Sequence, residues 1–474
     1  MRLTDATMYA RVLAGDAAYN GRFFTGVLTT GIYCLPSCKA RKPLRQNVRF
    51  FPTCAAARDH GLRACKKCHP DDFARGADPV LASIETIVSE IRAQPGALAD
   101  ARAVVQRSGF GQTRAFELFR QHYHTTPAEL LMRARLDRAK QRLLTTRAGL
   151  LTIAGEVGFE SLSGFHDQFR QRNGLTPAAY RELAVRRSFT VTLPQGYPLG
   201  YLRRALSRDL HSAHERLIGD AYTAALHLSS GPAGLTLRLA PTAIHAEISA
   251  GSAVEAHAIV IGLLGLDQDA AAFARLAKKL GLARLVAGRP ELRISQTVSV
   301  FDGVLWCIIG QQINFPFACM LKRRLFERTG TLLPNGLYAP PTPAAVAALD
   351  PKELLPLQFS RQKADYVIAI ARLISQGQLD LASLRSLSAT RAERTLLAIR
   401  GLGPWSVNYL MMRALGFADC VPYGDTSVTS NLQALFKLKE RPDIDTTRRL
   451  MAVFAPYRSL ATNQLWQFNQ PVPS

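Results

Sequence analysis

The sequence lacks any apolar run near the roughly 20 residues that a helix needs to cross a bilayer. Residues 1–18 contain neither a long apolar core nor a cleavage site, so a secretory signal peptide is not expected. Acidic residues are scarce, with 36 Asp and Glu against 59 Lys and Arg, a formal charge of +23. This excess favours a polyanionic partner. A membrane surface is the competing polyanion, but the positive charge is dispersed rather than gathered in one block. We therefore expect a cytoplasmic protein that binds nucleic acid and no membrane.

The chain of 474 residues is too long for a single core, and about three domains are expected. Cysteine is also scarce, with eight in the whole chain, and four of these are scattered. Isolated thiols are typical of buried free cysteines in a reducing cytoplasm. The scattered four are Cys54, Cys307, Cys319 and Cys420.

The other four cysteines form two close pairs, Cys34-Leu-Pro-Ser-Cys38 and Cys65-Lys-Lys-Cys68. Two such pairs can place four sulfurs at the corners of a tetrahedron, which Zn²⁺ prefers. The alternative is two disulfides in a secreted protein, which the absence of a signal peptide disfavours. Residues 39–67 carry nine basic side chains and one acidic one, so the predicted zinc site has a nucleic-acid-binding surface. Alternating β-forming residues over Phe24–Cys34 predict one strand that delivers Cys34 to a surface.

A zinc ion with four thiolates carries a net charge of about −2 by addition, and its sulfurs remain nucleophilic. Transfer of a methyl group to one sulfur would remove one negative charge and reduce the repulsion from DNA phosphates. The alternative is a purely structural zinc site.

Residues Tyr19 to Asp71 resemble the N-terminal domain of the bacterial Ada alkylation-response regulators, in cysteine spacing and in the surrounding sequence. The resemblance implies one Zn²⁺ held by the four cysteines, with Cys34 also accepting a methyl group from a DNA methylphosphotriester. It further implies contacts to the DNA backbone from Thr30, Lys39, Arg41 and Arg63.

The middle of the chain repeats itself. Gly109-Phe110, Phe119-Arg-Gln121 and Thr126-Pro-Ala128 recur as Gly158-Phe159, Phe169-Arg-Gln171 and Thr176-Pro-Ala178. Each copy predicts two short helices with a glycine at the turn, a helix-turn-helix. The second helix of each copy would present polar or basic residues to a major groove. These residues are Gln112, Thr113, Arg114, Ser161, Ser163 and His166.

This region resembles the AraC-type DNA-binding domain, particularly at Ile153–Phe159 and Thr176-Pro177, which implies promoter binding. Zinc module followed by AraC module is the order found in Ada. The Pro-Cys-His-Arg site for repair of O6-alkylguanine is missing, so the chain is not a complete Ada protein.

The C-terminal half begins with three segments that alternate like half-buried strands, and it becomes helical from about Gly251. The predicted strands are Phe189–Leu193, Gly234–Leu239 and Ile244–Ile248. The Gly401-Leu-Gly403 sequence opens an amphipathic helix, where free backbone N–H groups can bind a phosphate. One carboxylate, Asp425, follows about twenty residues later. A single carboxylate beside a DNA-gripping loop suits cleavage of an N-glycosidic bond, because it can stabilise an oxocarbenium-like sugar or orient water. Aromatic rings can receive the flipped base, and an electron-rich pocket favours cationic alkylated purines.

Residues from about Ser188 to Gln467 resemble 3-methyladenine DNA glycosylase II of the helix-hairpin-helix superfamily, through Phe301–Ile313, Gly401–Ser406 and Asp425. The resemblance places the catalytic aspartate at Asp425 and the pocket aromatics at Trp405, Tyr409 and Trp466. It implies DNA contacts at Gly401 and Gly403, and a DNA wedge at Gln312, where the family has an aliphatic residue. Bifunctional relatives have a lysine where this chain has Trp405, so a glycosylase without lyase activity is implied. The C-terminal cysteine set of iron–sulfur members is absent, and neither an iron–sulfur cluster nor an organic cofactor is expected.

We therefore predict a multidomain α+β protein. It comprises a four-cysteine zinc domain (1–78), an all-α double helix-turn-helix domain (79–187) and a glycosylase (188–474). The glycosylase is expected to contain an α/β subdomain (188–290) and a helix-hairpin-helix part (291–474). The predicted function is alkylation-damage response and repair on double-stranded DNA, as a monomer. The alternative is a transcription regulator whose C-terminal half binds DNA or a ligand without catalysis.

Overall fold

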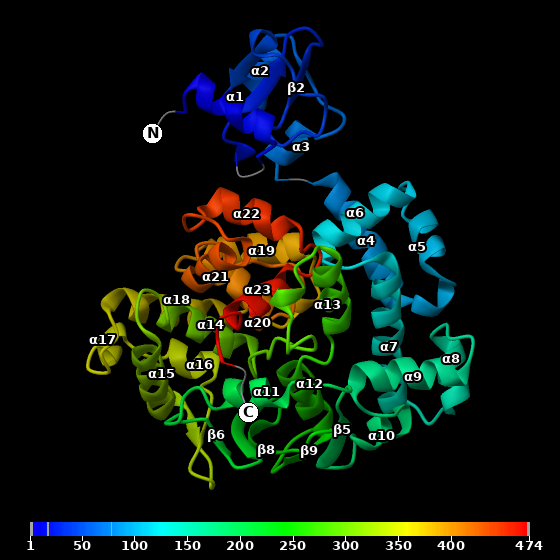
Figure 1. Cartoon of the computed structure of the whole chain (residues 1–474), viewed down its shortest axis with the longest axis vertical. Helices are drawn as coiled ribbons and strands as arrows, with labels where there is room; N and C mark the ends of the chain where they lie inside the picture. The colour runs from blue at the N-terminus through cyan, green and yellow to red at the C-terminus, as the bar shows by residue number, and fades with distance from the viewer. Residues whose placement is uncertain (1–2, 17–18, 77, 472–474) are drawn as a thin grey trace. The chain divides into compact units, whose positions relative to one another are not determined.

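The computed structural model describes residues 3–16, 19–76 and 78–471. The chain forms two compact units, Met1–Val88 and Ser89–Ser474 (Figure 1). The small sheet of the first unit and the larger sheet and many helices of the second confirm the predicted multidomain α+β class. None of the helices in the described ranges is long and apolar enough to cross a membrane.

The first unit is built on a four-stranded sheet of order β3-β1-β2-β4, in which only β2 and β4 are parallel. Its core is small and includes Phe24, Tyr33, Phe51 and Leu62. The strands are β1 (Phe24–Val27), β2 (Ile32–Cys34), β3 (Val48–Phe51) and β4 (Arg63–Ala64). The helices are α1 (Asp5–Ala14), η2 (Arg45–Asn47), α2 (Cys54–Asp59) and α3 (Pro70–Ala74), and α4 (Pro79–Ala93) follows.

The single strand predicted over Phe24–Cys34 is wrong, because the segment is the β1–β2 hairpin. The amides of Thr30 and Gly31 both donate to the carbonyl of Val27, at 3.2 and 3.0 Å. Gly31 has φ +63°, a left-handed conformation that favours glycine. The sequence pattern did not reveal the turn because the β-branched Thr29 and Thr30 continue the alternation of strand-forming residues through it. Cys34 is buried at the end of β2 and only 9% exposed, rather than delivered to an open surface.

The second unit begins with two helix pairs, α5–α6 and α8–α9, on either side of the long helix α7 (Figure 1). The predicted glycine turns are present, since Gly109 and Gly158 have φ of +67° and +93°. Gln112 opens α6 and is exposed, whereas Ser161 caps α9 by accepting the Gly164 amide at 3.1 Å. The helices are η3 (Pro95–Ala97), α5 (Ala101–Arg107), α6 (Gln112–Tyr123), α7 (Pro127–Thr145), α8 (Leu150–Glu156), α9 (Leu162–Asn173) and α10 (Pro177–Glu182).

A five-stranded antiparallel sheet of order β5-β9-β8-β7-β6 follows. Helices α11 and α12 pack beside it (Figure 1). The sequence prediction identified β5, β8 and β9 but missed β6 and β7, which lie between α11 and β8. The elements are β5 (Ser188–Thr192), α11 (Leu199–Leu206), β6 (Glu215–Ile218), β7 (Ala221–Leu228), β8 (Gly231–Leu239), β9 (Ala243–Ile248) and α12 (Ala253–Leu264).

One hydrophobic core joins the second helix-turn-helix to this sheet. It contains Phe169 and Tyr180 from the helices and Val191 from β5, all at most 5% exposed. The Thr192 amide donates to the Gly174 carbonyl at 2.9 Å. Buried His257 on α12 makes a 2.8 Å hydrogen bond through Nε2 to the carbonyl of Asn173. We call this region, formed by α8–α10, β5–β9 and α12, the shared core.

The remainder is helical, with a short hairpin of β10 (Thr331–Leu332) and β11 (Tyr338–Ala339). Its helices surround a second, larger core that includes Ile308, Val407 and Leu465. The helices are α13 (Ala270–Lys279), η4 (Ala283–Leu285), α14 (Val300–Ile309), α15 (Phe315–Thr329), α16 (Pro343–Ala347), α17 (Pro351–Leu354), α18 (Arg361–Ser375), η5 (Ser383–Arg385), α19 (Ala389–Leu397), α20 (Pro404–Arg413), α21 (Thr426–Phe436), α22 (Ile444–Ala452) and α23 (Arg458–Trp466).

Candidate functional site

The Asp425 carboxylate lies at the N-terminus of α21, where it is the N-cap residue. The backbone amide of Val428 donates to Oδ1 at 3.0 Å. This hydrogen bond caps the helix and also fixes the orientation of the carboxylate. Two indoles complete its environment. Trp405 Nε1 donates to Oδ2 and Trp466 Nε1 donates to Oδ1, each at 3.2 Å. Three N–H donors from three helices therefore hold one carboxylate in a defined orientation.

The three predicted pocket aromatics lie together beside Asp425. Trp405 and Tyr409 stack one turn apart on α20, with ring centroids 5.2 Å apart and planes 19° apart. Tyr409 also contacts Trp466 of α23, with centroids 5.9 Å apart. Tyr409 is 9% exposed, while Trp405 and Trp466 are half-buried. The rings thus present aromatic surface next to the carboxylate.

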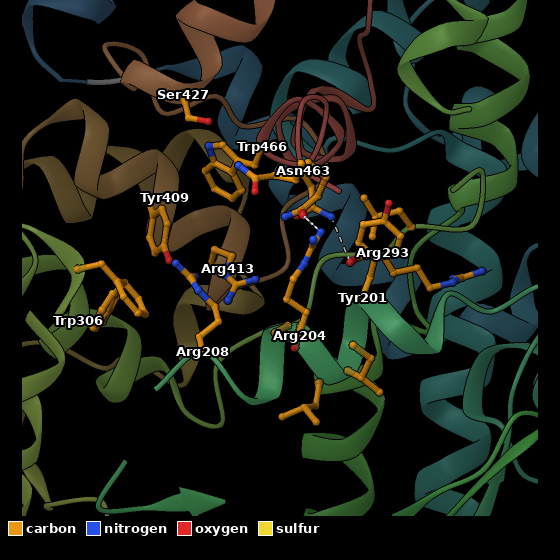
Figure 2. A pocket seen from close by; sticks show the side chains of 18 of the residues that line it. Tyr201, Arg204, Arg208, Arg293, Trp306, Tyr409, Arg413, Ser427, Asn463 and Trp466 are labelled. Carbon is orange, nitrogen blue, oxygen red and sulfur yellow. Dashed lines mark hydrogen bonds between the residues drawn. The ribbon is translucent and has the colours of Figure 1, made fainter. Parts of the chain in front are cut away.

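These residues line a cavity of about 560 Å³. Figure 2 shows its side chains converging from α11 and from the helices α14, α20, α21 and α23. The volume is sufficient for a nucleobase, and aromatic walls with a few polar groups are typical of ligand pockets. Besides Asp425 and its three aromatic neighbours, the lining includes Tyr201, Arg208, Trp306, Arg413 and Asn463.

The predicted hairpin connects α19 to α20 near this cavity. Gly401 has φ +100°, and a Cβ there would lie 2.7 Å from the ring of Tyr366. Gln311, which follows α14, holds the hairpin in place because its side-chain amide donates to the Gly401 carbonyl at 2.8 Å. Gly403 is the N-cap of α20 and has open space around its Cα. Gly403 and Pro404 are exposed at the N-terminus of α20, and a helix N-terminus is where a phosphate can bind.

Gln312 lies in the loop between α14 and α15 and is exposed. Its φ is +56°, a left-handed conformation that is uncommon for a residue other than glycine. Such strain is found where a loop holds a side chain in a particular place.

Sequence reasoning missed the arginines of the cavity, which are Arg204, Arg208, Arg293 and Arg413. Arg208 follows α11, and its guanidinium carbon lies 4.4 Å from the centroid of the Phe315 ring. Desolvation by the surrounding protein lowers the pKa of Arg208, the nearby Tyr409 hydroxyl opposes this, and repulsion from Arg413 adds to it. No local sequence signal could have found these residues, because only the tertiary fold brings Arg208 to the wall formed by α20.

In the first unit, the sulfurs of Cys34, Cys38, Cys65 and Cys68 all lie within 4.8 Å of one another. The parallel pairing of β2 with β4 brings the first pair to the second, since the Cys65 amide donates to the Tyr33 carbonyl at 3.0 Å. All four are free cysteines, which removes the disulfide alternative. Tetrahedral zinc with Zn–S bonds of about 2.3 Å requires sulfurs roughly 3.8 Å apart. The Cys38 and Cys65 sulfurs are 3.9 Å apart, so the donor set fits one Zn²⁺.

Backbone amides distinguish the four sulfurs. Cys68 Sγ accepts the Leu35 amide at 3.3 Å and Cys65 Sγ accepts the Lys67 amide at 3.4 Å. Cys38 receives a backbone hydrogen bond from Ala40. Within the described part of the chain, no backbone amide donates to Cys34. Hydrogen bonds withdraw charge from a thiolate, so Cys34 keeps the most electron-rich sulfur.

The four predicted DNA-backbone contacts are all exposed. Thr30 lies in the β1–β2 turn, Arg63 lies on the edge strand β4, and Lys39 and Arg41 follow Cys38. Lys39 and Arg41 follow Cys38, and Arg63 precedes Cys65 by two residues, so basic residues flank the cysteines in the sequence.

Family models match three separate parts of the chain. The metal-binding domain of Ada matches residues 7–71, a helix-turn-helix domain matches 104–183, and the HhH-GPD superfamily of base excision DNA repair proteins matches 305–456. The first match contains the four cysteines, and the third contains the hairpin and Asp425. The fold and the sites thus define a zinc-binding DNA regulator joined to a helix-hairpin-helix repair protein.

Three relatives make the assignment more specific. A Mycobacterium tuberculosis protein described as "Probable bifunctional transcriptional activator/DNA repair enzyme AlkA" is 28% identical over 97% of this chain and 95% of its own length. The AdaA activator/repair enzyme of Bacillus subtilis is 30% identical over 38% of this chain and 84% of its length. The DNA-3-methyladenine glycosylase of the same organism is 32% identical over 43% of this chain and 68% of its length. The chain belongs to the Ada family of activator/repair proteins and to the DNA-3-methyladenine glycosylase family, joined in one polypeptide.

Proposed function

We propose that this chain excises alkylated purines such as 3-methyladenine from double-stranded DNA, takes methyl groups from DNA methylphosphotriesters onto Cys34, and regulates transcription by binding promoters. The observation that carries the proposal is the Asp425 carboxylate, which lines the cavity and is held by the indoles of Trp405 and Trp466. An acceptor-only group beside aromatic walls suits the departure of a flipped base from a sugar that becomes positively charged.

Excision breaks the bond between C1′ of the sugar and the base nitrogen, and the electron pair leaves with the base. Asp425 stabilises the positive charge that develops on the sugar, or orients the water whose oxygen adds to C1′ as its proton departs. Trp405, Tyr409 and Trp466 stack on the flipped base. Alkylation at a ring nitrogen makes the base cationic, which improves both its stacking on these rings and its departure.

We also propose that the glycosylase has no lyase activity. Lyase chemistry requires an amine that attacks C1′ and forms a Schiff base. Trp405 stands where the related bifunctional enzymes have that lysine. Among the described residues that line the cavity there is no lysine.

Asp425→Asn is the decisive variant, because asparagine also caps helices well and removes only the charge. We expect release of 3-methyladenine from methylated duplex DNA to fall about a hundredfold or more, with DNA binding retained. Asp443→Asn is a matched control, since Asp443 caps α22 in the same way and accepts the Thr446 amide at 2.8 Å. Absence of base release by the wild type, with DNA binding intact, would instead favour the non-catalytic regulator.

For methyl transfer, Cys34 is supported by the electron-rich character of its sulfur. Zn²⁺, when bound by the four cysteines, would keep their sulfurs deprotonated. The Cys34 sulfur attacks the methyl carbon, the carbon–oxygen bond breaks, and the phosphodiester leaves with the electron pair. Cys34 becomes a neutral thioether, so the reaction is stoichiometric. Loss of one negative charge weakens the repulsion between this surface and DNA.

The two helix-turn-helix pairs support promoter binding, with Gln112 and its neighbours on α6 directed to one major groove and Ser163 and His166 on α9 to the next. We propose the three-part organisation predicted from the sequence, with parts that meet near residues 78 and 187 and with the shared core joining the second part to the third. We further propose that Thr30, Lys39, Arg41 and Arg63 contact the DNA backbone, that Gly401 and Gly403 grip a phosphate, and that Gln312 fills the gap left by the flipped base. The protein would act as a monomer in the cytoplasm.

A further inference from the structure

Two histidines at the end of α6 join the first helix-turn-helix to the C-terminal helices of the second unit. His122 Nδ1 makes a 2.8 Å hydrogen bond with the hydroxyl of Thr390 on α19, the helix that leads to the Gly401 hairpin. His124, the C-cap residue of α6, contacts the loop between α20 and α21. Helix α6 accordingly lies beside α19 (Figure 1). One of the two predicted DNA-reading helices therefore packs against the elements that carry the hairpin and Asp425.

The contact of His124 is a hydrogen bond to the backbone of this loop. The Asp419 amide donates to His124 Nδ1 at 3.2 Å, and the imidazole packs on the Phe417 ring with centroids 5.7 Å apart and planes 77° apart. Among the described residues, no other group accepts this amide. Desolvation lowers the pKa of His124 to about 4, against the charge of Asp419 and with the charges of Arg458 and His122. The imidazole is therefore neutral at neutral pH, and Nδ1 can act as the acceptor.

This loop ends at Asp425, the N-cap residue of α21. Three consecutive backbone amides near its start each donate to a side chain from a different helix. The amides of Asp419, Cys420 and Val421 donate to His124 at the end of α6, Ser459 on α23 and Asn408 on α20, at 3.2, 2.9 and 3.3 Å. A turn closed by the Asp425 amide on the Pro422 carbonyl, at 3.0 Å, connects these anchors to the carboxylate. One of the three anchors of the loop therefore comes from the helix-turn-helix.

A second set of contacts connects Asp419 to the end of the loop. Asp419 is 8% exposed, and its carboxylate accepts hydrogen bonds from Nε and Nη2 of Arg458 at 2.8 and 2.7 Å. Burial raises the pKa of Tyr423, and the interaction of its hydroxyl with Arg458 opposes this rise. Tyr423 lies two residues before Asp425. A shift of Asp419 would therefore also disturb the segment next to the candidate catalytic carboxylate.

We propose that His124 is a positioning residue for base excision, which holds the loop of Asp425 in place from the helix-turn-helix. This inference rests on the proposed glycosylase function. Without His124 the Asp419 amide would lose its acceptor, and because an unpaired amide in a buried segment is unfavourable, the loop would rearrange. A carboxylate that acts on the charge developing at the sugar tolerates little displacement. The first helix-turn-helix is thus part of the repair machinery as well as a predicted DNA reader.

Substitutions at position 124 separate the hydrogen bond from the backbone conformation. His124 has φ +52°, which glycine and asparagine adopt with little strain. His124→Gly removes the acceptor, whereas His124→Asn supplies an amide oxygen in place of Nδ1. His124→Leu fills the space without an acceptor and serves if the glycine variant is unstable. Lys437→Gly is the matched control, because Lys437 is the exposed C-cap residue of α21 and has φ +53°.

Single-turnover release of 3-methyladenine from methylated duplex DNA is measured at saturating protein, together with DNA affinity. We expect His124→Gly and His124→Leu to slow release about tenfold or more and to change affinity by less than about twofold. His124→Asn should stay within about threefold of the wild type, and Lys437→Gly should release base at the wild-type rate. Unchanged release in His124→Gly, equal slowing in Lys437→Gly, or no recovery in His124→Asn would overturn the proposal.

Hydrogen exchange keeps the inference testable even if the wild type releases no base. The amides of residues 416–425 should exchange faster in His124→Gly than in the wild type, and His124→Asn should restore the slower exchange. The amides of β7 and β8 should be unchanged, which reports an intact fold. Unchanged exchange over residues 416–425, or faster exchange with normal release, would contradict the inference. Absence of release by the wild type alone would contradict only the proposed catalytic function.

Discussion

The two reactive centres of this chain differ in how they are held. Cys34 is one of four cysteines brought together by short strands and tight turns around a small core, and it lies in a cluster that fits a metal. Asp425 is positioned by three helices and two indoles within a large core. The proposed reactions differ accordingly, since the cysteine is consumed and the aspartate is unchanged. A centre that reacts once can depend on a metal-stabilised module, whereas a centre that turns over needs a rigid pocket.

The strongest test of this comparison is Cys34→Ser. Methyl uptake from methylphosphotriester DNA should be abolished, because among the four clustered cysteines Cys34 is the one whose sulfur accepts no amide from the described residues. Base release should remain within about twofold, since the change lies in the other compact unit. Uptake is measured by mass spectrometry of the cysteine peptides. Cys68→Ser is the matched variant, and a methyl group found on Cys68 of the wild type would contradict the assignment to Cys34.

Removal of zinc should affect the two compact units differently. The first unit has a core too small to be stable without its metal, so a chelator should unfold it and eliminate methyl uptake. Base release should persist, because the helices around Asp425 contain none of the four cysteines. Limited proteolysis reports the state of residues 19–76, and release of 3-methyladenine reports the pocket. Parallel loss of both activities would show that the units depend on each other.

The hairpin offers a matched glycine pair of intermediate effect. Gly401→Ala should destabilise the second unit by about 1–3 kcal/mol, because φ is +100° and the new Cβ would meet Tyr366 at 2.7 Å. Gly403→Ala should cost less than about 0.5 kcal/mol of folding stability, since its Cα faces open space and its φ is ordinary. Thermal or denaturant unfolding measures both. Similar losses for the two variants would contradict the geometry described for the hairpin.

The last test concerns the pH dependence of stability, through His257 in the shared core, and its effect is confined to acidic pH. Desolvation lowers the pKa of His257 to about 4, with Lys140 adding to the effect and the hydrogen bond to Asn173 opposing it. The unfolded chain takes up the proton near pH 6.5, so stability is full above that pH and falls as pH drops toward 4. The loss from this group is roughly 3 kcal/mol. His257→Gln should flatten the dependence, and His227→Gln, at an exposed position, should not. An unchanged slope in His257→Gln would contradict this origin.

Local patterns in the sequence predicted much of the structure. The spacing of the four cysteines identified the metal cluster, and Gly109 and Gly158 marked the helix-turn-helix turns. Both predictions succeeded because each pattern is formed by residues that are close together in the sequence. The Gly401 hairpin was found in the same way, whereas the role of Asp425 was predicted from the family resemblance and stays a prediction. The β1–β2 turn was missed because the threonines at 29 and 30 favour strands. Arg208 was missed because its place in the cavity depends on packing between parts of the chain that are far apart in sequence.

The shared core also constrains how the protein can be made. A chain that ended near residue 187 would leave the apolar faces of α9 and α10 without β5 and α12 to cover them. During synthesis, the second helix-turn-helix must therefore wait until α12 has left the ribosome before its packing is complete. A promoter-binding fragment cannot be released intact by cutting at that point. Folding of the regulatory module is thus coupled to folding of the repair module through the shared core.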